Sequence, residues 1–131
     1  MQKLNFPEYT FKFKSKDNKL AIFSTLRKKY LILTPEEWVR QHCVQFLISE
    51  KGYSPSLLNE ERKIDLNGIT KRYDIVAYKP EGLIKLIVEC KAPQIKITQE
   101  TFDQIARYNL ALKADYLMIS NGLNHYFCTM N

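Results

Sequence analysis

Of all the residues in this sequence, three charged ones have the types and spacing that best suit a catalytic site: Asp74, Glu89 and Lys91. Glu89 and Lys91 stand two apart near the end of a segment that we expect to be a strand, so they share one of its faces. Asp74 lies in the preceding segment, which a tight turn connects to this one. Two carboxylates suit Mg²⁺, which takes one or two of them together with waters and phosphate oxygens. Lys91 would orient a water and offset charge on phosphorus.

The segment that carries Glu89 and Lys91 is otherwise apolar. Alternation places one set of side chains on the first face, namely Lys85, Ile87, Glu89 and Lys91. It places the other set on the second face, namely Ile84, Leu86, Val88 and Cys90. Glu89 and Lys91 could instead form an ordinary solvent-exposed ion pair, because such pairs are common on the surface. The apolar surroundings favour a site, and the Cys90 side chain is expected in the core.

A helix is predicted to precede these strands, from Thr34 to about Glu50. Thr34 can cap it, Pro35 suits its first turn, and Glu37 completes a T-x-x-E capping box. Its expected buried stripe has five residues, Trp38, Val39, Cys43, Phe46 and Leu47. We expect His42 on the surface of this helix.

The elements after this helix predict a mixed α/β domain. Three strands are expected at 57–66, 71–78 and 83–91, with turn signals at Asn67-Gly68 and 80–82. A second helix, from Thr98 to about Lys113, then forms a strand-helix-strand crossover to a buried strand at 116–119. A last strand covers 125–130. We expect one domain over residues 1–131.

The net charge of +6 is confined to the start of the chain. Residues 1–30 hold eight basic and two acidic side chains, whereas residues 31–131 hold twelve of each. Residues 1–33 are expected to form a basic, β-rich extension. Its first strand, 9–14, alternates aromatic residues with Lys12 and Lys14, and strands at 20–23 and 30–33 follow.

Several classes of protein are excluded by composition. With four glycines, the sequence contains neither GxGxxG nor GxxxxGK[ST], so no nucleotide-binding loop is encoded. No apolar run approaches the ~18 residues of a membrane span, and the N-terminus lacks the apolar core of a signal peptide. Cys43, Cys90 and Cys128 are far apart, which argues against a zinc site or a disulfide framework and suits a reducing cytoplasm.

The spacing of the charged residues is similar to a known motif. Asp74, fourteen intervening residues and Glu89-x-Lys91 resemble the PD-(D/E)xK nuclease motif. Gln104 and Tyr108, on the second predicted helix, resemble the Q-x-x-x-Y signature of the RecB-like branch.

Two further segments strengthen this resemblance, 34–41 and Ser120-Asn121-Gly122. Over about residues 20–130 the chain resembles small bacterial proteins similar to the N-terminal nuclease domain of type I restriction enzyme R subunits. Tyr73 departs from the motif, where its name expects proline, but that position varies in the superfamily. The resemblance implies a restriction-endonuclease-like core over 34–131, with a helix, a three-stranded meander, a crossover helix and a strand, followed by a last C-terminal strand.

The resemblance also implies roles for individual residues. Asp74 and Glu89 would be metal ligands, with the Cys90 backbone carbonyl as a third, and Lys91 would be the catalytic lysine. Glu37 matches the acidic residue of the family's first helix, which supports the metal site, although it can equally serve the capping box alone.

The second helix has its own pair of implied site residues. Gln104 and Tyr108 share one helical face and would orient the lysine and the DNA backbone. An ordinary polar edge of an amphipathic helix is the alternative for them.

Three functions remain open at this point. The leading hypothesis is an endonuclease of a restriction-modification system that hydrolyses DNA with Mg²⁺, for which Mn²⁺ can substitute. The others are a DNA-binding module that does not cleave and an assembly domain with the same fold. The expected partners are a translocase or restriction-system subunit and a second copy of the chain. Contact with a membrane is not expected.

Residues 1–30 would attract the phosphates of DNA in general, so neutralising Lys12, Lys14, Arg27, Lys28 and Lys29 should weaken DNA binding.

Overall fold

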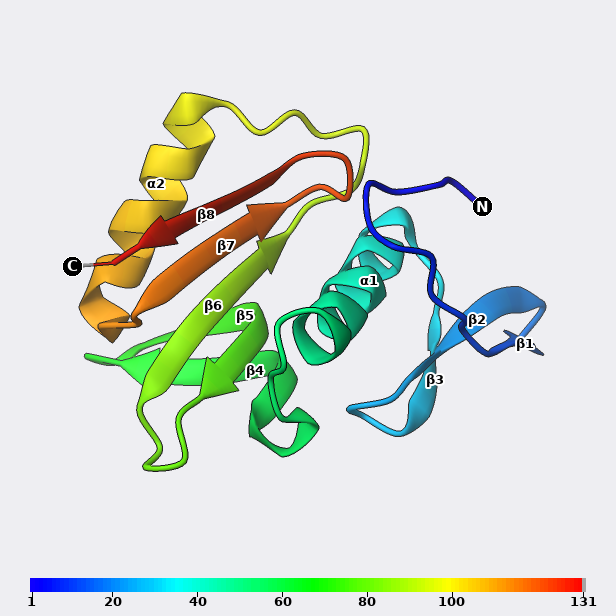
Figure 1. Ribbon diagram of the computed structural model, residues 1–131, viewed down its shortest axis with the longest axis horizontal. Helices are drawn as coiled ribbons and strands as arrows, with labels where there is room; N and C mark the ends of the chain where they lie inside the picture. The colour runs from blue at the N-terminus through cyan, green and yellow to red at the C-terminus, as the bar shows by residue number, and fades with distance from the viewer. Residues whose placement is uncertain (131) are drawn as a thin grey trace.

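Two β-sheets and two α-helices form the fold in the computed structural model, which describes residues 1–130 (Figure 1). Residue 131, the last residue of the predicted domain, lies outside the described part. The smaller sheet is antiparallel in the order β1-β2-β3, with strands at Phe13–Lys16, Lys19–Ser24 and Lys29–Ile32. It lies beside α1, on the side away from the larger sheet (Figure 1).

The larger sheet has the order β4-β5-β6-β7-β8. Its strands are Leu58–Leu66, Ile69–Tyr78, Ile84–Cys90, Tyr116–Ser120 and His125–Thr129. β6 and β7 are parallel, and the other neighbours are antiparallel. The crossover between β6 and β7 contains α2 (Gln99–Asn109), which continues into a 3₁₀ turn at Leu110–Leu112. The predicted order of helix, meander, crossover helix and strand is therefore confirmed.

The first helix, α1 (Pro35–Ser49), begins as its sequence predicts. The Thr34 hydroxyl accepts a hydrogen bond of 3.0 Å from the Glu37 backbone N–H, which caps the helix. A 3₁₀ turn at Pro55–Leu57 then leads into β4. The hairpin turn at Asn67-Gly68 also forms as expected, with positive φ at both residues, 53° and 78°.

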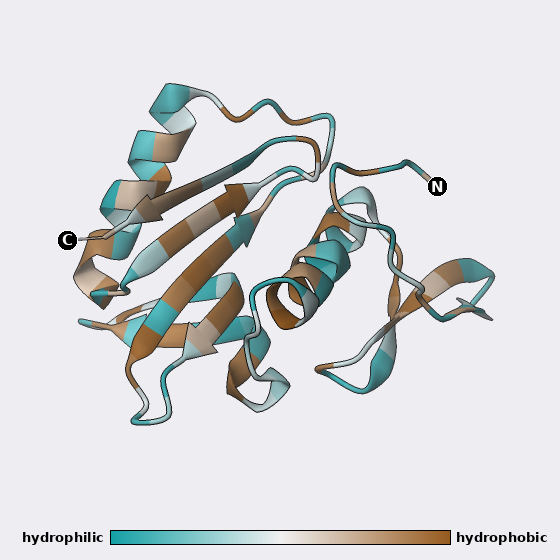
Figure 2. Ribbon diagram, in the orientation of Figure 1, coloured by the Kyte–Doolittle hydropathy of each residue, from teal (hydrophilic) through white to brown (hydrophobic). Residues whose placement is uncertain are grey.

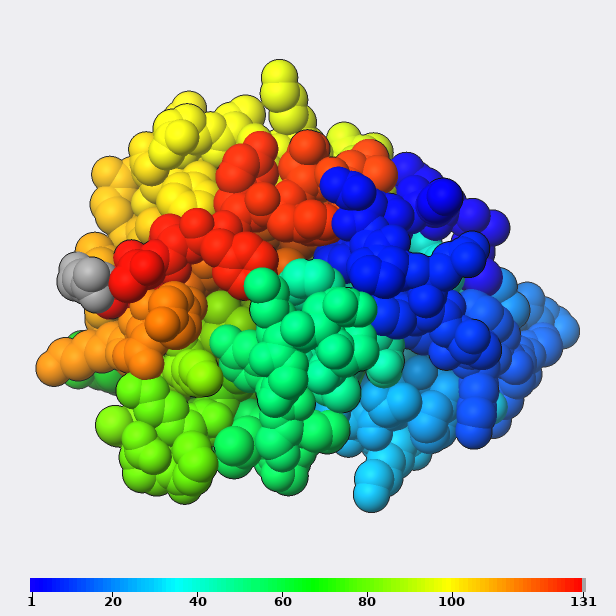
Figure 3. All heavy atoms as spheres, viewed as in Figure 1, coloured from blue at the N-terminus to red at the C-terminus, as the bar shows by residue number. Residues whose placement is uncertain are grey.

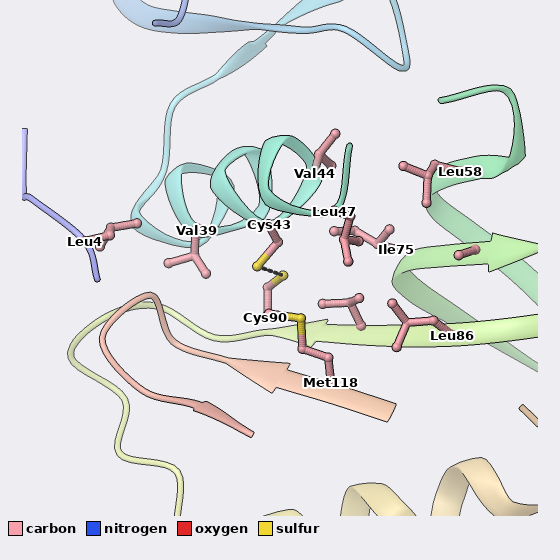
Figure 4. Packing of buried hydrophobic residues seen from close by; sticks show 12 residues of the cluster. Leu4, Val39, Cys43, Val44, Leu47, Leu58, Ile75, Leu86, Cys90 and Met118 are labelled. Carbon is pink, nitrogen blue, oxygen red and sulfur yellow. Dashed lines mark hydrogen bonds between the residues drawn. The ribbon is translucent and has the colours of Figure 1, made fainter. Parts of the chain in front are cut away.

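The core consists of two apolar clusters on opposite faces of the larger sheet. The first packs α1 against β5, β6 and β7 through Val39, Cys43, Leu47, Ile75, Cys90 and Met118 (Figure 4). The second packs α2 against the other face. The hydropathy colours show the same arrangement, with apolar residues concentrated in the central strands and in α1 (Figure 2). Trp38 and Phe46 are only partly buried, and Val44, which was not predicted, is fully buried.

The N-terminal segment covers one end of this core. The Asn5 backbone N–H donates a hydrogen bond of 2.7 Å to the Gly122 carbonyl, and Leu4 belongs to the first cluster. The space-filling view shows this segment lying against the last strands of the chain (Figure 3). His42 is consequently 6% exposed, so its predicted place on the helix surface is wrong. Sequence periodicity could not show that Phe6 and Phe11 would cover it.

Two strands differ in detail from the prediction. The predicted strand 9–14 pairs only from Phe13 onward, because Tyr9 and Phe11 pack against His42 of α1. The pairing of β5 with β6 skips one residue: Ala77 pairs with Leu86, but the next residue, Tyr78, pairs with Ile84, so Lys85 forms a bulge. This bulge moves Ile84 to the α2 side and brings the Lys85 ammonium 5.0 Å from the Tyr53 ring. The predicted faces of Ile84 and Lys85 are therefore wrong.

Among residues 1–130, no helix combines the length and the apolar character that crossing a membrane requires.

Candidate active site

Asp74 lies where the regular pairing of β5 is interrupted. Its neighbours Tyr73 and Ile75 pair with Arg62 and Glu60 of β4, and Ile75 begins the described pairing with β6. Glu61, which lies between Glu60 and Arg62, has a φ of 54°, a value that non-glycine residues adopt rarely. The Asp74 side chain takes part in the interrupted pairing instead, since its Oδ2 accepts a hydrogen bond of 2.7 Å from the Cys90 backbone N–H.

The carboxyl groups of Asp74 and Glu89 lie close enough together to raise the pKa of Glu89. The pKa of Glu89 is raised to about 7, first by burial and then by the Asp74 carboxylate, while the charges of Lys71 and Lys91 oppose the rise. Burial also raises the pKa of Asp74, although hydrogen bonds from Cys90 and Glu89 and the charge of Arg40 act against this. Both carboxyl groups therefore hold a proton more readily than exposed carboxyl groups do.

Lys91 lies beside this pair of carboxyl groups. Its charge influences both Glu89 and Glu36, which is located in the first turn of α1. Burial raises the pKa of Glu36 above its ordinary value, Asp74 adds to the rise, and Arg40 and Lys91 oppose it. Within residues 1–130 the Lys91 ammonium has no ion pair shorter than 4.0 Å, so it is not committed to any one carboxylate.

Arg40 of α1 connects the helix to this group. Its guanidinium donates to Glu37 Oε1 at 2.7 Å, to Glu61 Oε1 at 2.5 Å and to Asp74 Oδ1 at 3.2 Å. The Arg40 side chain is 7% exposed, and the surrounding carboxylates raise its pKa although burial alone would lower it. A buried cation thus holds carboxylates from three different elements.

A second hydrogen-bond chain leads from Glu37 away from the site. The Gln41 amide donates to Glu37 Oε2 at 2.8 Å and to Glu60 Oε1 at 2.6 Å. Glu60 Oε2 accepts a short hydrogen bond from the Ser24 hydroxyl of β2. Both oxygens of Glu37 are therefore occupied by protein donors, and Glu37 reaches Asp74 only through Arg40.

Tyr108 of α2 approaches the pair from the other side of the sheet through Lys71. The Lys71 ammonium lies 3.8 Å from Glu89 Oε1 and 4.5 Å from the centre of the Tyr108 ring. Gln104, one helical turn earlier, is exposed, and its side chain makes no hydrogen bond within the described residues. The structure thus brings Tyr108 next to the site but gives Gln104 no contact there.

The oxygen atoms of Asp74 and Glu89 could serve as ligands for a hard divalent cation, which would then be held by two protein carboxylates. Glu89 Oε1 is buried and lacks a hydrogen-bond partner within residues 1–130, beside the carboxylate of Asp74. No group of three or more Asp, Glu, His or Cys side chains is arranged for a metal in this part of the chain. Mg²⁺ needs only one or two carboxylates, because waters and substrate oxygens complete its shell, so Asp74 and Glu89 fit it. The Cys90 side chain is buried 4.0 Å from the Cys43 sulfur, in the core as predicted.

The α/β core, with Asp74 on β5, Glu89 on the neighbouring β6 and Lys91 directly after β6, defines a restriction-endonuclease-like domain. A family described as "Type I restriction enzyme R protein N terminus" matches residues 35–131, and the chain belongs to this family. The match begins at Pro35, the first residue of α1, so the smaller sheet lies outside it. A search of curated proteins finds no match.

Arg40, Glu61 and Lys71 were missed by reasoning from the sequence. Arg40 carries a weak signal, because it falls between Val39 and Cys43 of the predicted apolar stripe and three residues after Glu37. Glu61 and Lys71 look like ordinary charged residues of an exposed hairpin. Only their three-dimensional positions relate them to Asp74 and Glu89.

Proposed function

We propose that this chain hydrolyses DNA phosphodiester bonds with Mg²⁺, or with Mn²⁺ in its place. The observation that carries the proposal is the placement of two largely buried carboxyl groups, Asp74 and Glu89, beside each other, with Glu89 Oε1 lacking a hydrogen-bond partner among residues 1–130. Mg²⁺ suits such a pair because it takes one or two protein carboxylates and completes its shell with waters and phosphate oxygens. Membership of the R protein N-terminal family supports a nuclease-related role.

Asp74 and Glu89 would hold the ion, with the Cys90 backbone carbonyl as a third ligand. The bound ion would stabilise negative charge on the phosphate and make an attacking water more acidic. Because burial and Asp74 raise the pKa of Glu89 to about 7, this side chain would have to be ionised to serve as a carboxylate ligand.

Lys91 would bind a phosphate oxygen and orient the attacking water. Its ammonium is free of close ion pairs among the described residues, and its charge opposes the rise in the pKa of both Glu36 and Glu89. A compact cation in this position stabilises the charge that develops on phosphorus.

Arg40 and Glu37 would position Asp74 rather than contact the substrate. Arg40 binds one oxygen of Asp74 while the Cys90 N–H binds the other, so the carboxylate is held from two sides. Glu37 fixes Arg40 through a two-point contact at 2.7 and 3.1 Å. In this proposal Glu37 supports the metal site through Arg40.

The test is cleavage of plasmid and linear DNA with Mg²⁺ or Mn²⁺. The wild-type chain should cleave, while Asp74→Asn and Lys91→Gln should lose at least about a hundredfold in rate, the size expected for removing charge stabilisation at the reacting phosphate. Matched controls are Asp103→Asn and Lys96→Gln, both exposed and remote from these contacts. Equal cleavage by all five proteins would reveal a contaminant and contradict the assignment.

A DNA-binding role without cleavage is the second candidate. The Arg40 contact to Asp74 favours it, because a protein cation already balances this carboxylate without metal. In that case cleavage would be absent in both metals while binding to DNA would persist and weaken with salt. A restriction-system or translocase subunit would then be the partner that supplies the reaction.

A further inference from the structure

We infer that a small apolar pocket beside Glu89 holds one unpaired nucleobase of the DNA strand whose backbone enters the site. This inference rests on the proposed function, since it places the base next to the phosphodiester that Asp74 and Glu89 would address. The hairpin of β4 and β5 and the end of α2 form the pocket. Its apolar walls are Ile64, Leu66, Ile69, Tyr73 and Tyr108.

Lys71 connects the pocket to the site. Its ammonium lies between the rings of Tyr73 and Tyr108, 4.8 and 4.5 Å from their centres, and 3.8 Å from Glu89 Oε1. A group bound against Tyr108 is therefore separated from Glu89 by one side chain. Lys71 can contact the phosphate that joins the bound nucleotide to the next one.

The size and surface of the pocket suit a single planar ring system. Its volume is about 170 Å³, below the roughly 300 Å³ at which pockets for drug-sized ligands begin. Tyr108 is 60% exposed and Ile69 is 68% exposed, so an aromatic ring and an aliphatic side chain both present apolar surface to solvent. Bases stack on exposed aromatic rings of this kind irrespective of their sequence.

The end of the hairpin next to the pocket, residues 62–72, is net basic, which favours a polyanion as the occupant. Residues 62–72 contain four basic side chains and a single acidic one, Asp65. Arg62 and Lys63 are exposed along β4, and Arg72, which is exposed on β5, also pairs with Glu61 at 3.2 Å. Basic residues beside a stacking surface are the combination by which proteins bind single-stranded nucleic acid.

The base must be unpaired to enter. In a duplex, each base is stacked and paired, and removing it from the helix costs a few kcal/mol, whereas a base in a single strand or frayed end is accessible. The pocket therefore gives the chain a preference for single-stranded DNA or open ends.

The experiment measures binding of the full chain to a short fluorescein-labelled single-stranded DNA in EDTA, where the proposed hydrolysis does not proceed. The comparison ligand is a strand of equal length that contains only abasic sites. Loss of one stacked base should weaken binding roughly tenfold, so Tyr108→Ala and Ile69→Ser should each approach the affinity of the abasic strand. Tyr116→Ala and Leu83→Ser are matched controls, since these side chains are 42% and 61% exposed but lie outside the pocket.

Two outcomes would contradict the inference that the pocket binds a nucleobase. One is equal affinity for the normal and the abasic strand, and the other is equal loss of affinity in the pocket variants and their controls. Cleavage with Mn²⁺, measured on the same proteins, separates this inference from the proposed function. If the chain cleaves DNA but does not bind the normal strand more tightly than the abasic one, only the base-binding role of the pocket is contradicted. If it binds the normal strand more tightly but does not cleave, the base-binding role is supported and the proposed hydrolysis is contradicted.

Discussion

Arg40 Nη1 lies 3.2 Å from Asp74 Oδ1, which ties the first helix to the carboxylate at the interruption of β5. The same guanidinium binds Glu37 and Glu61, and the side chains of Arg40 and Glu37 are each 7% exposed. A buried network of this kind is stable only while all its charges are present, because each ion has lost its hydration.

Arg40→Gln should therefore lower the free energy of unfolding by roughly 3–5 kcal/mol, since it leaves the buried Glu37 carboxylate without its cation. Urea denaturation without added metal measures this difference. Arg72→Gln is the control, because Arg72 is 55% exposed and also pairs with Glu61, and it should cost at most about 1 kcal/mol. Similar decreases in the two variants would show that burial of the network contributes nothing.

Glu89 should make the stability of the chain depend on pH. Its pKa is raised to about 7 by burial and by Asp74, whereas an exposed glutamate titrates near about 4.3. The folded chain thus holds an extra proton between these values, so the stability due to this proton is complete below pH of about 4 and is lost as pH rises through about 7.

Glu89→Gln is neutral at every pH and should lose less stability than the wild type between about pH 5 and about pH 8. Urea denaturation at a series of pH values, in EDTA, provides the comparison. Parallel curves for the two proteins would mean that Glu89 is already ionised in the folded chain near neutral pH.

Much of the fold could be predicted because its signals are local. The cap at Thr34 and the turn at Asn67-Gly68 depend on residues a few positions apart, and both formed as expected. The bulge at Lys85 could not be predicted, because it depends on how β6 registers with β5. The burial of His42 depends on a segment more than thirty residues away, as its contact with Phe6 shows.

The candidate site was predictable only in part, for a similar reason. Asp74, Glu89 and Lys91 stand out because charges interrupt apolar strands. The partners of Arg40 come from α1, β4 and β5, so no single segment reveals that they meet. The spacing of Arg40 and Gln41, three and four residues after Glu37, allows these contacts, but it does not show that together they bind both oxygens of Glu37.

Gly122 should tolerate a side chain less well than Gly52. Its φ is +86°, and a Cβ there would lie 2.8 Å from a terminal carbon of Leu4 and 3.1 Å from one of Val39. Gly52 has a similar φ of +72° but no atom within 4 Å of the added carbon.

Gly52→Ala therefore measures backbone strain alone, about 1–2 kcal/mol. Gly122→Ala should cost more by about 1–3 kcal/mol through overpacking against the N-terminal segment. Thermal unfolding of both variants tests this order. If Gly52→Ala were as damaging as Gly122→Ala, the close packing of Leu4 on Gly122 would be contradicted.

The outer face of the smaller sheet should attract DNA by charge. The Lys12 and Lys14 ammonium groups lie over the rings of Phe23 and Tyr30, at 5.8 and 4.4 Å from the ring centres. Replacing both lysines with Gln should weaken DNA binding and lower the salt slope by about 1 for each phosphate that is no longer bound. Lys51→Gln, remote from this sheet, is the control. An unchanged slope would mean that these charges serve solubility alone.

The central claim is that Asp74 and Glu89 together form a divalent-metal site, and anomalous scattering from crystals soaked in Mn²⁺ tests it most directly. We predict an anomalous peak in contact with carboxylate oxygens of both residues, and its disappearance in crystals of Asp74→Asn. The absence of a peak beside these residues, or a peak that persists unchanged in Asp74→Asn, would contradict the claim.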